Sequence, residues 1–176
     1  TSFLLSVDFI DASTGWSTGQ SGTIIATTDG GTTWSPQTSG TTSFLLSVDF
    51  IDASTGWSTG SSGTILGTTD GGATWSPQTS GTSSTLRAVD FVDASTGWGV
   101  GDGGTILGTT DGGATWSPQT SGTTTGLQGV DFIDASTGWG VGFSGTILAT
   151  TDGGANWSAQ TSGTTSFLLS VDFIDA

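Results

Sequence analysis

Residues 42–82 read TSFLLSVDFIDASTGWSTGSSGTILGTTDGGATWSPQTSGT, and this stretch decides the fold because the chain repeats it. The units are 1–41, 42–82, 83–123 and 124–164, and residues 165–176 repeat residues 1–12 letter for letter. The same valine recurs every 41 residues, as Val7, Val48, Val89, Val130 and Val171. A period of this length is typical of solenoids, propellers and other repeat arrays.

The second unit predicts four short strands, at 45–52, 57–60, 64–69 and 74–79. In the first of them Leu46, Val48 and Phe50 share one face, and the Asp-Gly segments at 52–56 and 70–72 are turn sequences. Prolines at 36, 77 and 118 fall in the fourth strand, which suits an outer edge. Four strands per unit are typical of one propeller blade.

We therefore predict an all-β chain, a β-propeller of four-stranded antiparallel blades with a 41-residue repeat. Residues 1–164 form four blades, and 165–176 are an extra first strand of a fifth unit. The alternative is a β-solenoid, whose coils are usually shorter and lack tight hairpins.

Every unit also contains the pattern Thr-x-Asp-x-Gly-x-x-Trp, which resembles the Asp box of bacterial neuraminidase-type repeats. The wider pattern, VDFIDASTGW followed by GTIL and TTDGG, is similar to the propeller repeats of photosystem II assembly factors. The resemblance implies blade architecture, but Asp boxes also occur in sialidases, sortilin-type receptors and xyloglucan hydrolases. We expect structural roles, the carboxylate bonding the hairpin and the indole packing on a neighbouring blade, for Asp29, Trp34, Asp70, Trp75, Asp111, Trp116, Asp152 and Trp157.

Composition excludes several functions. The net charge is −14, with fifteen acids, one Arg, and no Lys, His, Cys or Tyr. A nucleic-acid groove needs clustered cations, and thiol, imidazole or Ser–His chemistry needs residues that are missing. No stretch is apolar enough to cross a membrane. The absence of Cys leaves the redox compartment open.

The sequence lacks the residues that the enzymes with Asp boxes use for catalysis. A sialidase-like site needs an arginine cluster and a tyrosine, and a xyloglucanase-like site needs two carboxylates in different environments, which near-identical repeats do not offer. The assembly-factor resemblance implies partner contact through a basic patch, which this chain lacks. The acids at 8, 49, 90, 131 and 172 would bind Ca²⁺ if they converged on an axis, but backbone bonding is the interpretation we favour. We predict no enzyme activity, no cofactor and no metal.

Differences between units gather on one face of the predicted ring. Ser17-Thr18 and Ser58-Thr59 of the first two units are replaced by Gly99-Val100 and Gly140-Val141 in the last two. The units also differ at the positions that residues 3, 5 and 20 hold in unit one. Loops on such a face often bind ligands, although neutral variation is the alternative. The candidate binding residues are Arg87, Asp102, Gln128 and Phe143.

Two functions remain. The first is a structural or assembly propeller whose near-identical blades form a closed oligomer, two chains making an eight-bladed ring, or join the neighbouring repeats of a longer array. The second is a glycan- or protein-binding module that uses the variable face. In the first, residues 165–176 replace residues 1–12 of the same or a second chain, or begin a fifth blade.

Overall fold

The computed structural model describes residues 2–174 and contains four antiparallel four-stranded sheets, one for each full unit. The first blade consists of β1 (Leu4–Phe9), β2 (Gly15–Gly19), β3 (Ile24–Thr27) and β4 (Ser35–Gln37). The second consists of β5 (Leu45–Phe50), β6 (Gly56–Gly60), β7 (Ile65–Thr68) and β8 (Ser76–Gln78). The third consists of β9 (Leu86–Phe91), β10 (Gly97–Gly101), β11 (Ile106–Thr109) and β12 (Ser117–Gln119). The fourth consists of β13 (Leu127–Phe132), β14 (Gly138–Gly142), β15 (Ile147–Thr150) and β16 (Ser158–Gln160).

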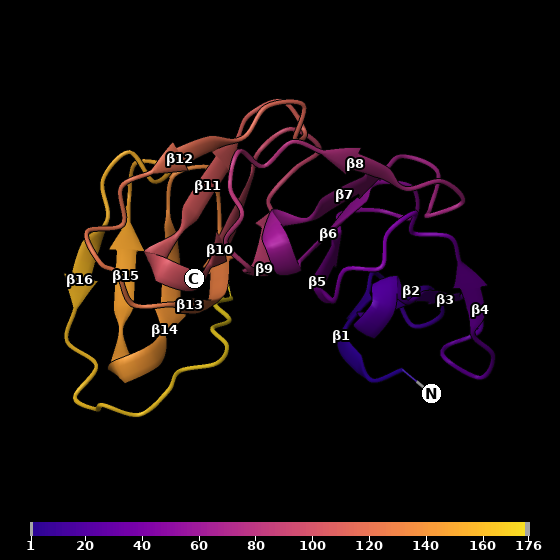
Figure 1. Ribbon diagram of the computed structural model, residues 1–176, viewed down its shortest axis with the longest axis horizontal. Coiled ribbons are helices and arrows are strands. Elements are labelled where there is room, and N and C mark those ends of the chain that lie inside the picture. Colours follow the sequence, from indigo (N-terminus) through magenta and orange to yellow (C-terminus); the bar gives the residue numbers. More distant parts are fainter. Residues whose placement is uncertain (1, 175–176) are drawn as a thin grey trace.

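The sheets follow one another around an arc in chain order (Figure 1). Within each sheet the strands stand in sequence order, and the first strands β1, β5, β9 and β13 contact one another along the inside of the arc. The fourth strands, which carry the prolines, are therefore outermost. The predicted all-β propeller fold is confirmed.

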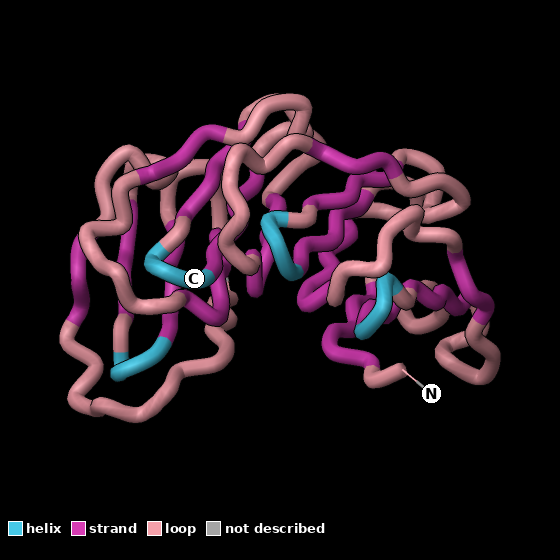
Figure 2. Tube along the Cα trace, viewed as in Figure 1, coloured by secondary structure: helices cyan, strands magenta, loops and turns pink. Residues whose placement is uncertain are grey.

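Local details differ from the sequence prediction in two ways. Pairing between β5 and β6 shifts register between Leu45 and Ser47, so a bulge buries Leu45 with Val48 and Phe50, and Leu46 is only partly buried. The predicted turn at 61–63 is a 3-10 turn. The same turn follows the second strand of each blade and is drawn cyan in Figure 2. Its middle residue has a positive φ, as at Ser62 (58°).

The core lies between blades and is largely aromatic. At the first junction Trp16 stacks on Phe50 with ring centroids 3.5 Å apart, and Trp75 meets the same Phe50 edge-on at 5.8 Å. The next two junctions repeat this arrangement of two tryptophans around one phenylalanine. Leu45, Val48 and Leu66 complete the first of these clusters. Each blade thus depends on the next one to bury its aromatic face.

Some unit-to-unit differences lie in this core and not on a surface. Thr18 and Thr59 are fully buried on β2 and β6, and their hydroxyls have no hydrogen-bond partner within the described residues. The matching residues of the third and fourth blades are Val100 and Val141, both buried. The sequence assignment of this position to the variable face was therefore wrong, because a second strand is covered on both sides.

Replacing Thr59 by valine is expected to raise the free energy of unfolding by about 1 kcal/mol, since the change removes an unpaired buried hydroxyl and keeps the side-chain shape. Urea unfolding followed by circular dichroism measures it. The control is Thr68→Val, which should destabilise because the Thr68 hydroxyl bonds Asp70 and accepts the Gly72 N–H. A loss of stability in Thr59→Val would contradict the prediction.

Candidate functional site

The hairpin that carries the Asp-box pattern is held by its carboxylate. Asp70 Oδ1 accepts the Thr68 hydroxyl at 2.9 Å and the Thr74 N–H at 2.9 Å, and Oδ2 accepts the Thr74 hydroxyl at 2.7 Å. These bonds, the Thr74 hydroxyl first, lower the pKa of Asp70. The equivalent bonds surround Asp29, Asp111 and Asp152.

The same hairpin is also the hydrogen-bonding contact between blades. The carbonyl of Gly71 accepts Trp16 Nε1 at 3.0 Å and Gln37 Nε2 at 3.1 Å, both from the preceding blade, and Trp75 Nε1 donates back to Gln37 Oε1 at 3.2 Å. Gln37 also covers Gly72, whose φ of 86° and lack of a side chain make room for it. We call this set of contacts the junction lock. It recurs at the second and third junctions through Gln78 with Trp116 and Gln119 with Trp157.

The two ends of the arc each hold one half of this lock. In the first blade Gly30, Gly31 and Trp34 form the receiving half, and among residues 2–174 no glutamine covers Gly31 as Gln37 covers Gly72. In the fourth blade Trp139 and Gln160 form the donating half, and Gln160 Nε2 turns back to the carbonyl of Ser158 at 3.1 Å.

The first blade also exposes the apolar face that its neighbours bury. Leu4 is 49 % exposed, Val7 58 % and Phe9 42 %, whereas the matching Leu45 and Val48 are 0 % and 5 % exposed. A shallow apolar cavity of about 450 Å³ lies at this end of the arc, lined by Leu4, Leu5, Ser6, Val7, Ser17 and Trp34. This end of the arc has the apolar residues of an interior junction, but no preceding blade covers them.

A row of carboxylates crosses the junctions along the first strands. Each of four acids accepts, through Oδ2, the backbone N–H of the phenylalanine 42 residues further on, in the following unit, at 2.8–2.9 Å; they are Asp8, Asp49, Asp90 and Asp131. Burial raises the pKa of Asp49 well above its ordinary value, with repulsion from Asp90 and Asp8 adding to it. Burial also raises the pKa of Asp90 to about 7, against the opposing effect of the Phe132 N–H. The described residues include no group of three or more acids placed to hold a metal ion.

The second set of acids lies in exposed turns. Asp52 Oδ1 accepts the hydroxyl and N–H of Ser54 and the N–H of Thr55, and these bonds lower its pKa. Asp11, Asp93 and Asp134 do the same in their own turns. The fifth member of this set, Asp175, lies outside the described residues, as does position 176 of the predicted extra strand.

Three of the four predicted binding residues meet at one edge of the arc. Arg87 on β9 pairs with Asp102 through Nε–Oδ1 (2.5 Å) and Nη2–Oδ2 (3.2 Å), and its guanidinium carbon lies 6.0 Å from the centre of the Phe143 ring. Phe143 in turn contacts Phe167, with ring centroids 4.6 Å apart. Gln128 stands apart and bonds the backbone carbonyl of Leu127.

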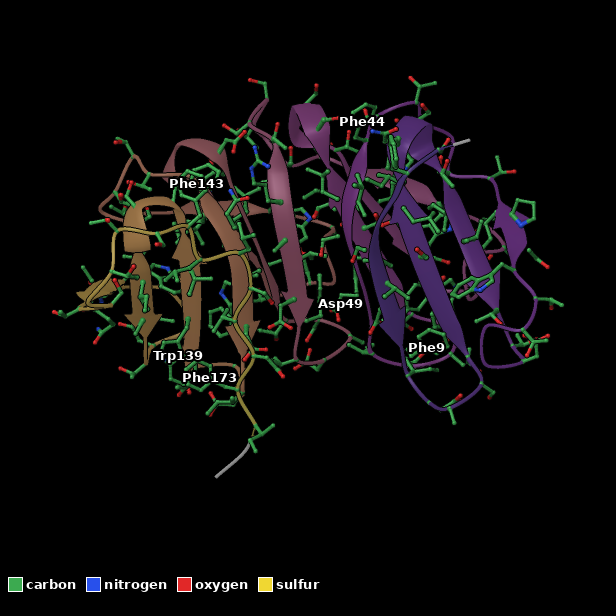
Figure 3. The ribbon with its side chains drawn as sticks, turned by 90° about the horizontal axis from the view of Figure 1, so that it is seen from below. Phe9, Phe44, Asp49, Trp139, Phe143 and Phe173 are labelled. Atoms are coloured by element: carbon green, nitrogen blue, oxygen red, sulfur yellow. The ribbon has the colours of Figure 1, made fainter. Side chains whose placement is uncertain are left out.

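Figure 3 shows Phe143 on the same edge as Phe44, opposite the edge that carries Phe9, Asp49, Trp139 and Phe173. We call the edge formed by the first-strand starts and the 3-10 turns the variable rim. The two segments are joined there by backbone bonds such as Asp102 N to the Thr85 carbonyl and Phe143 N to the Gly126 carbonyl. The side chains of Arg87 and Asp102 are 32 % and 41 % exposed, so the pair is open to a ligand.

The sequence model of the photosynthesis system II assembly factor YCF48 family matches residues 37–117 and 78–159. The chain belongs to this family. The resemblance predicted from the sequence is thus confirmed. No match was found among curated proteins.

Solved structures of YCF48 and of GH74 enzymes share the fold. YCF48 bound to D1 peptide superposes with a TM-score of 0.70 and 24 % identity over 95 % of this chain, which spans 52 % of that YCF48 chain. The GH74 enzyme of Niastella koreensis superposes with a TM-score of 0.71 and 18 % sequence identity. The match covers 87 % of this chain and 28 % of the GH74 chain. An ancestral GH74 enzyme superposes with a TM-score of 0.69 and 15 % sequence identity, over 88 % of this chain and 23 % of the enzyme. At these identities the likeness is one of fold.

Sequence reasoning overlooked the glutamines of the junction lock. Gln37, Gln78, Gln119 and Gln160 recur every 41 residues, three positions after the Asp-box tryptophan, but most other positions of the near-identical units recur in the same way, so this recurrence does not single them out. Their partners lie 34 and 38 residues away in the next unit, which no local pattern reveals. Among the described residues the structure contains no helix long and apolar enough to cross a membrane.

Proposed function

We propose that this YCF48-family chain is a non-enzymatic, protein-binding assembly propeller whose arc is completed by a second copy of itself. The observation that carries the proposal is the complementarity of its two ends. The receiving half of the junction lock in the first blade matches the donating half in the fourth, where Gln160 is exposed and Trp139 is covered by Phe173 of the C-terminal segment. Three interior junctions of near-identical sequence use the same lock.

Two copies fit this role by count and by symmetry. Each chain contributes four blades, so two chains give eight blades with two identical head-to-tail junctions related by a twofold axis. The coverage of about half of the YCF48 chain by four blades is in keeping with an arc that is half of a ring. Alternatively, the same junction joins the chain to the neighbouring repeats of a longer array that does not close into a ring.

A non-enzymatic role is supported by the way the carboxylates are used. The junction acids bond backbone N–H groups and the turn acids bond Ser and Thr, so the described carboxylates serve mainly the architecture. Asp102, which stands outside the repeat registers, is paired with Arg87.

Light scattering coupled to size-exclusion chromatography tests ring closure. We expect a species of about 35 kDa, twice the 17.5 kDa of the chain, favoured by salt because each chain carries a net charge of −14. Gln160→Ala should shift the equilibrium toward the monomer, and the matched control Gln20→Ala, on the variable rim, should not. A 17.5 kDa species at all concentrations and salt levels would reject ring closure.

The variable rim supports a second candidate function, binding of a protein or glycan ligand. The observation in its favour is the half-exposed Arg87–Asp102 pair beside Phe143 and Phe167, the one place where the repeat symmetry is broken by charge. The YCF48 structure with a D1 peptide makes a peptide the first ligand class to test. The tryptophans of the interior stacks are at most 3 % exposed, so a sugar would have to stack on rim phenylalanines.

Phe143→Ala is expected to weaken binding of a rim ligand at least about tenfold, because an aromatic anchor at the centre of an interface typically carries about 1–2 kcal/mol or more. A peptide and glycan array probed with the labelled protein identifies the ligand, and titration calorimetry measures the change. Phe44→Ala, on the same rim but away from Arg87, is the matched control. Equal losses in both variants would show that the Arg87 cluster is not the site.

A further inference from the structure

The C-terminal segment lies where the first strand of a next blade belongs. Phe173 stacks on Trp139 with ring centroids 3.8 Å apart, and its N–H donates to Asp131 Oδ2 at 2.9 Å. These contacts copy those of Phe50 with Trp16 and Asp8 at the first junction. Figure 3 shows the two rings side by side. No strand is assigned within 165–174, because the segment has no second strand beside it.

The approach to this segment is already built as in the interior of the arc. The Ser162 hydroxyl donates to the Thr164 carbonyl and accepts the Thr164 N–H, as the Ser39 hydroxyl does with Thr41. The Ser166 carbonyl accepts the Gly145 N–H at 2.8 Å, as the Ser43 carbonyl accepts that of Gly22. The connection out of the fourth blade therefore has the geometry that leads into a complete blade.

This placement conflicts with a simple end-to-end docking of two copies. In a ring, Phe9 of the second copy would have to stack on Trp139 of the first, where Phe173 already lies. Residues 1–12 and 165–176 are identical, so the two segments compete for one place. One of them has to leave.

We propose that the C-terminal segment stays and enters the second copy, so that residues 165–174 of one chain become the first strand of the partner's first blade. They pair with β2 of the second copy and displace its residues 2–10. This inference rests on the ring closure proposed above and specifies how the junction is made.

Two observations favour this direction of exchange. Keeping residues 165–174 in place preserves the hydrogen bonds of the connection at 162–166, including that from the Gly145 N–H to the Ser166 carbonyl, whereas releasing the segment gives them up. Releasing β1 costs no net pairing, because the incoming residues are the same and restore every contact to β2.

The exchange also covers the apolar residues of the segment. Phe173 is 43 % exposed, whereas Phe50 at the interior junction is 5 % exposed because Trp75 meets its ring edge-on. In the partner's first blade Trp34 lies in that position, since it already meets Phe9 edge-on at 5.9 Å. Entry therefore completes the group of two tryptophans around one phenylalanine that the other junctions contain.

Disulfide trapping tests the exchange in the full chain, which has no cysteine of its own. Val7 and Ser17 are direct partners between β1 and β2, and paired antiparallel residues lie about 4.5–5.5 Å apart, within disulfide range. Exchange puts Val171 in the place of Val7. The double variant Ser17→Cys, Val171→Cys should therefore form a covalent dimer of about 35 kDa under mild oxidation, seen on a non-reducing gel. Val7→Cys, Ser17→Cys is the control pair, which links within one chain wherever β1 remains in its blade.

The outcomes separate the two proposals. A 35 kDa species by light scattering that forms the Val7–Ser17 link and not the Ser17–Val171 link would overturn the exchange and leave ring closure standing. A monomer without the Ser17–Val171 link would overturn both. A Ser17–Val171 link within a 17.5 kDa chain would mean that the segment closes on its own first blade, which also overturns the exchange. Deleting residues 1–10 should leave the dimer intact, and deleting 165–176 should weaken it at least about tenfold.

Discussion

Replacing Trp98 by alanine is expected to lower the free energy of unfolding by about 3–5 kcal/mol. Trp98 is 2 % exposed, its indole stacks on Phe132 with ring centroids 3.4 Å apart, and Nε1 donates to the Gly153 carbonyl at 3.1 Å. Truncation opens a cavity at the third junction and removes one bond of its lock. Because Phe132 also meets Trp157, the loss extends to the next aromatic contact.

Urea unfolding measured by circular dichroism gives the size of this loss. Trp98→Phe is the conservative control, since it keeps an aromatic ring beside Phe132 but loses the indole N–H and part of the ring, and it should cost about 1–2 kcal/mol. A loss below 1 kcal/mol in Trp98→Ala would show that the aromatic stacks do not hold the blades together, and would weaken the case for a junction of the same kind between chains.

The blade was predictable from local signals because its turns have a strict chemistry. Asp and Gly at 52–56 and 70–72 mark chain reversals, and the 41-residue spacing of Val48 and Val89 fixes the unit. A bulge leaves no such mark in the sequence. It moved Leu45 into the core in place of Leu46, since one extra residue reverses the alternation on one side of it.

The candidate site was predictable only in part. Arg87, Asp102 and Phe143 share an edge because departures from the repeat at matching strand ends fall on the same side of a propeller. Gln128, the unpaired residue of the bulge between Leu127 and Gly129, donates to the backbone carbonyl of Leu127 in its own strand. The junction lock depends on contacts between units, and identical units give no covariation by which the pairing of Gln37 with Trp75 could be seen in one sequence.

Stability is expected to fall as the pH rises from about 4 to about 8, because the buried junction acids must lose their protons. The pKa of Asp90 is raised to about 7 by burial, and the pKa values of Asp49, Asp8 and Asp131 are raised as well. A carboxyl whose folded pKa lies above its unfolded value of about 3.9 binds more protons when folded, so its contribution is full below pH 4 and is lost as the pH passes the folded pKa. The turn acids, with lowered pKa values, act in the opposite sense and lose their contribution only below about pH 4.

Asp90→Asn isolates the part of this dependence that comes from one buried junction acid. The amide keeps a side-chain oxygen for the Phe132 N–H, which Asp90 Oδ2 accepts at 2.8 Å, and it cannot ionise. At pH 8 the variant should be more stable than the parent by roughly 1–3 kcal/mol, and near pH 4.5 the difference should vanish, as measured by urea unfolding across the pH range. The control is Asp93→Asn in the adjacent turn, which should be less stable than the parent at pH 8 because its carboxylate accepts the Ser95 and Thr96 N–H groups. A parent whose stability is flat between pH 5 and pH 8, or an Asp90→Asn variant that is weaker at pH 8, would mean that Asp90 is ionised in the folded arc at little cost.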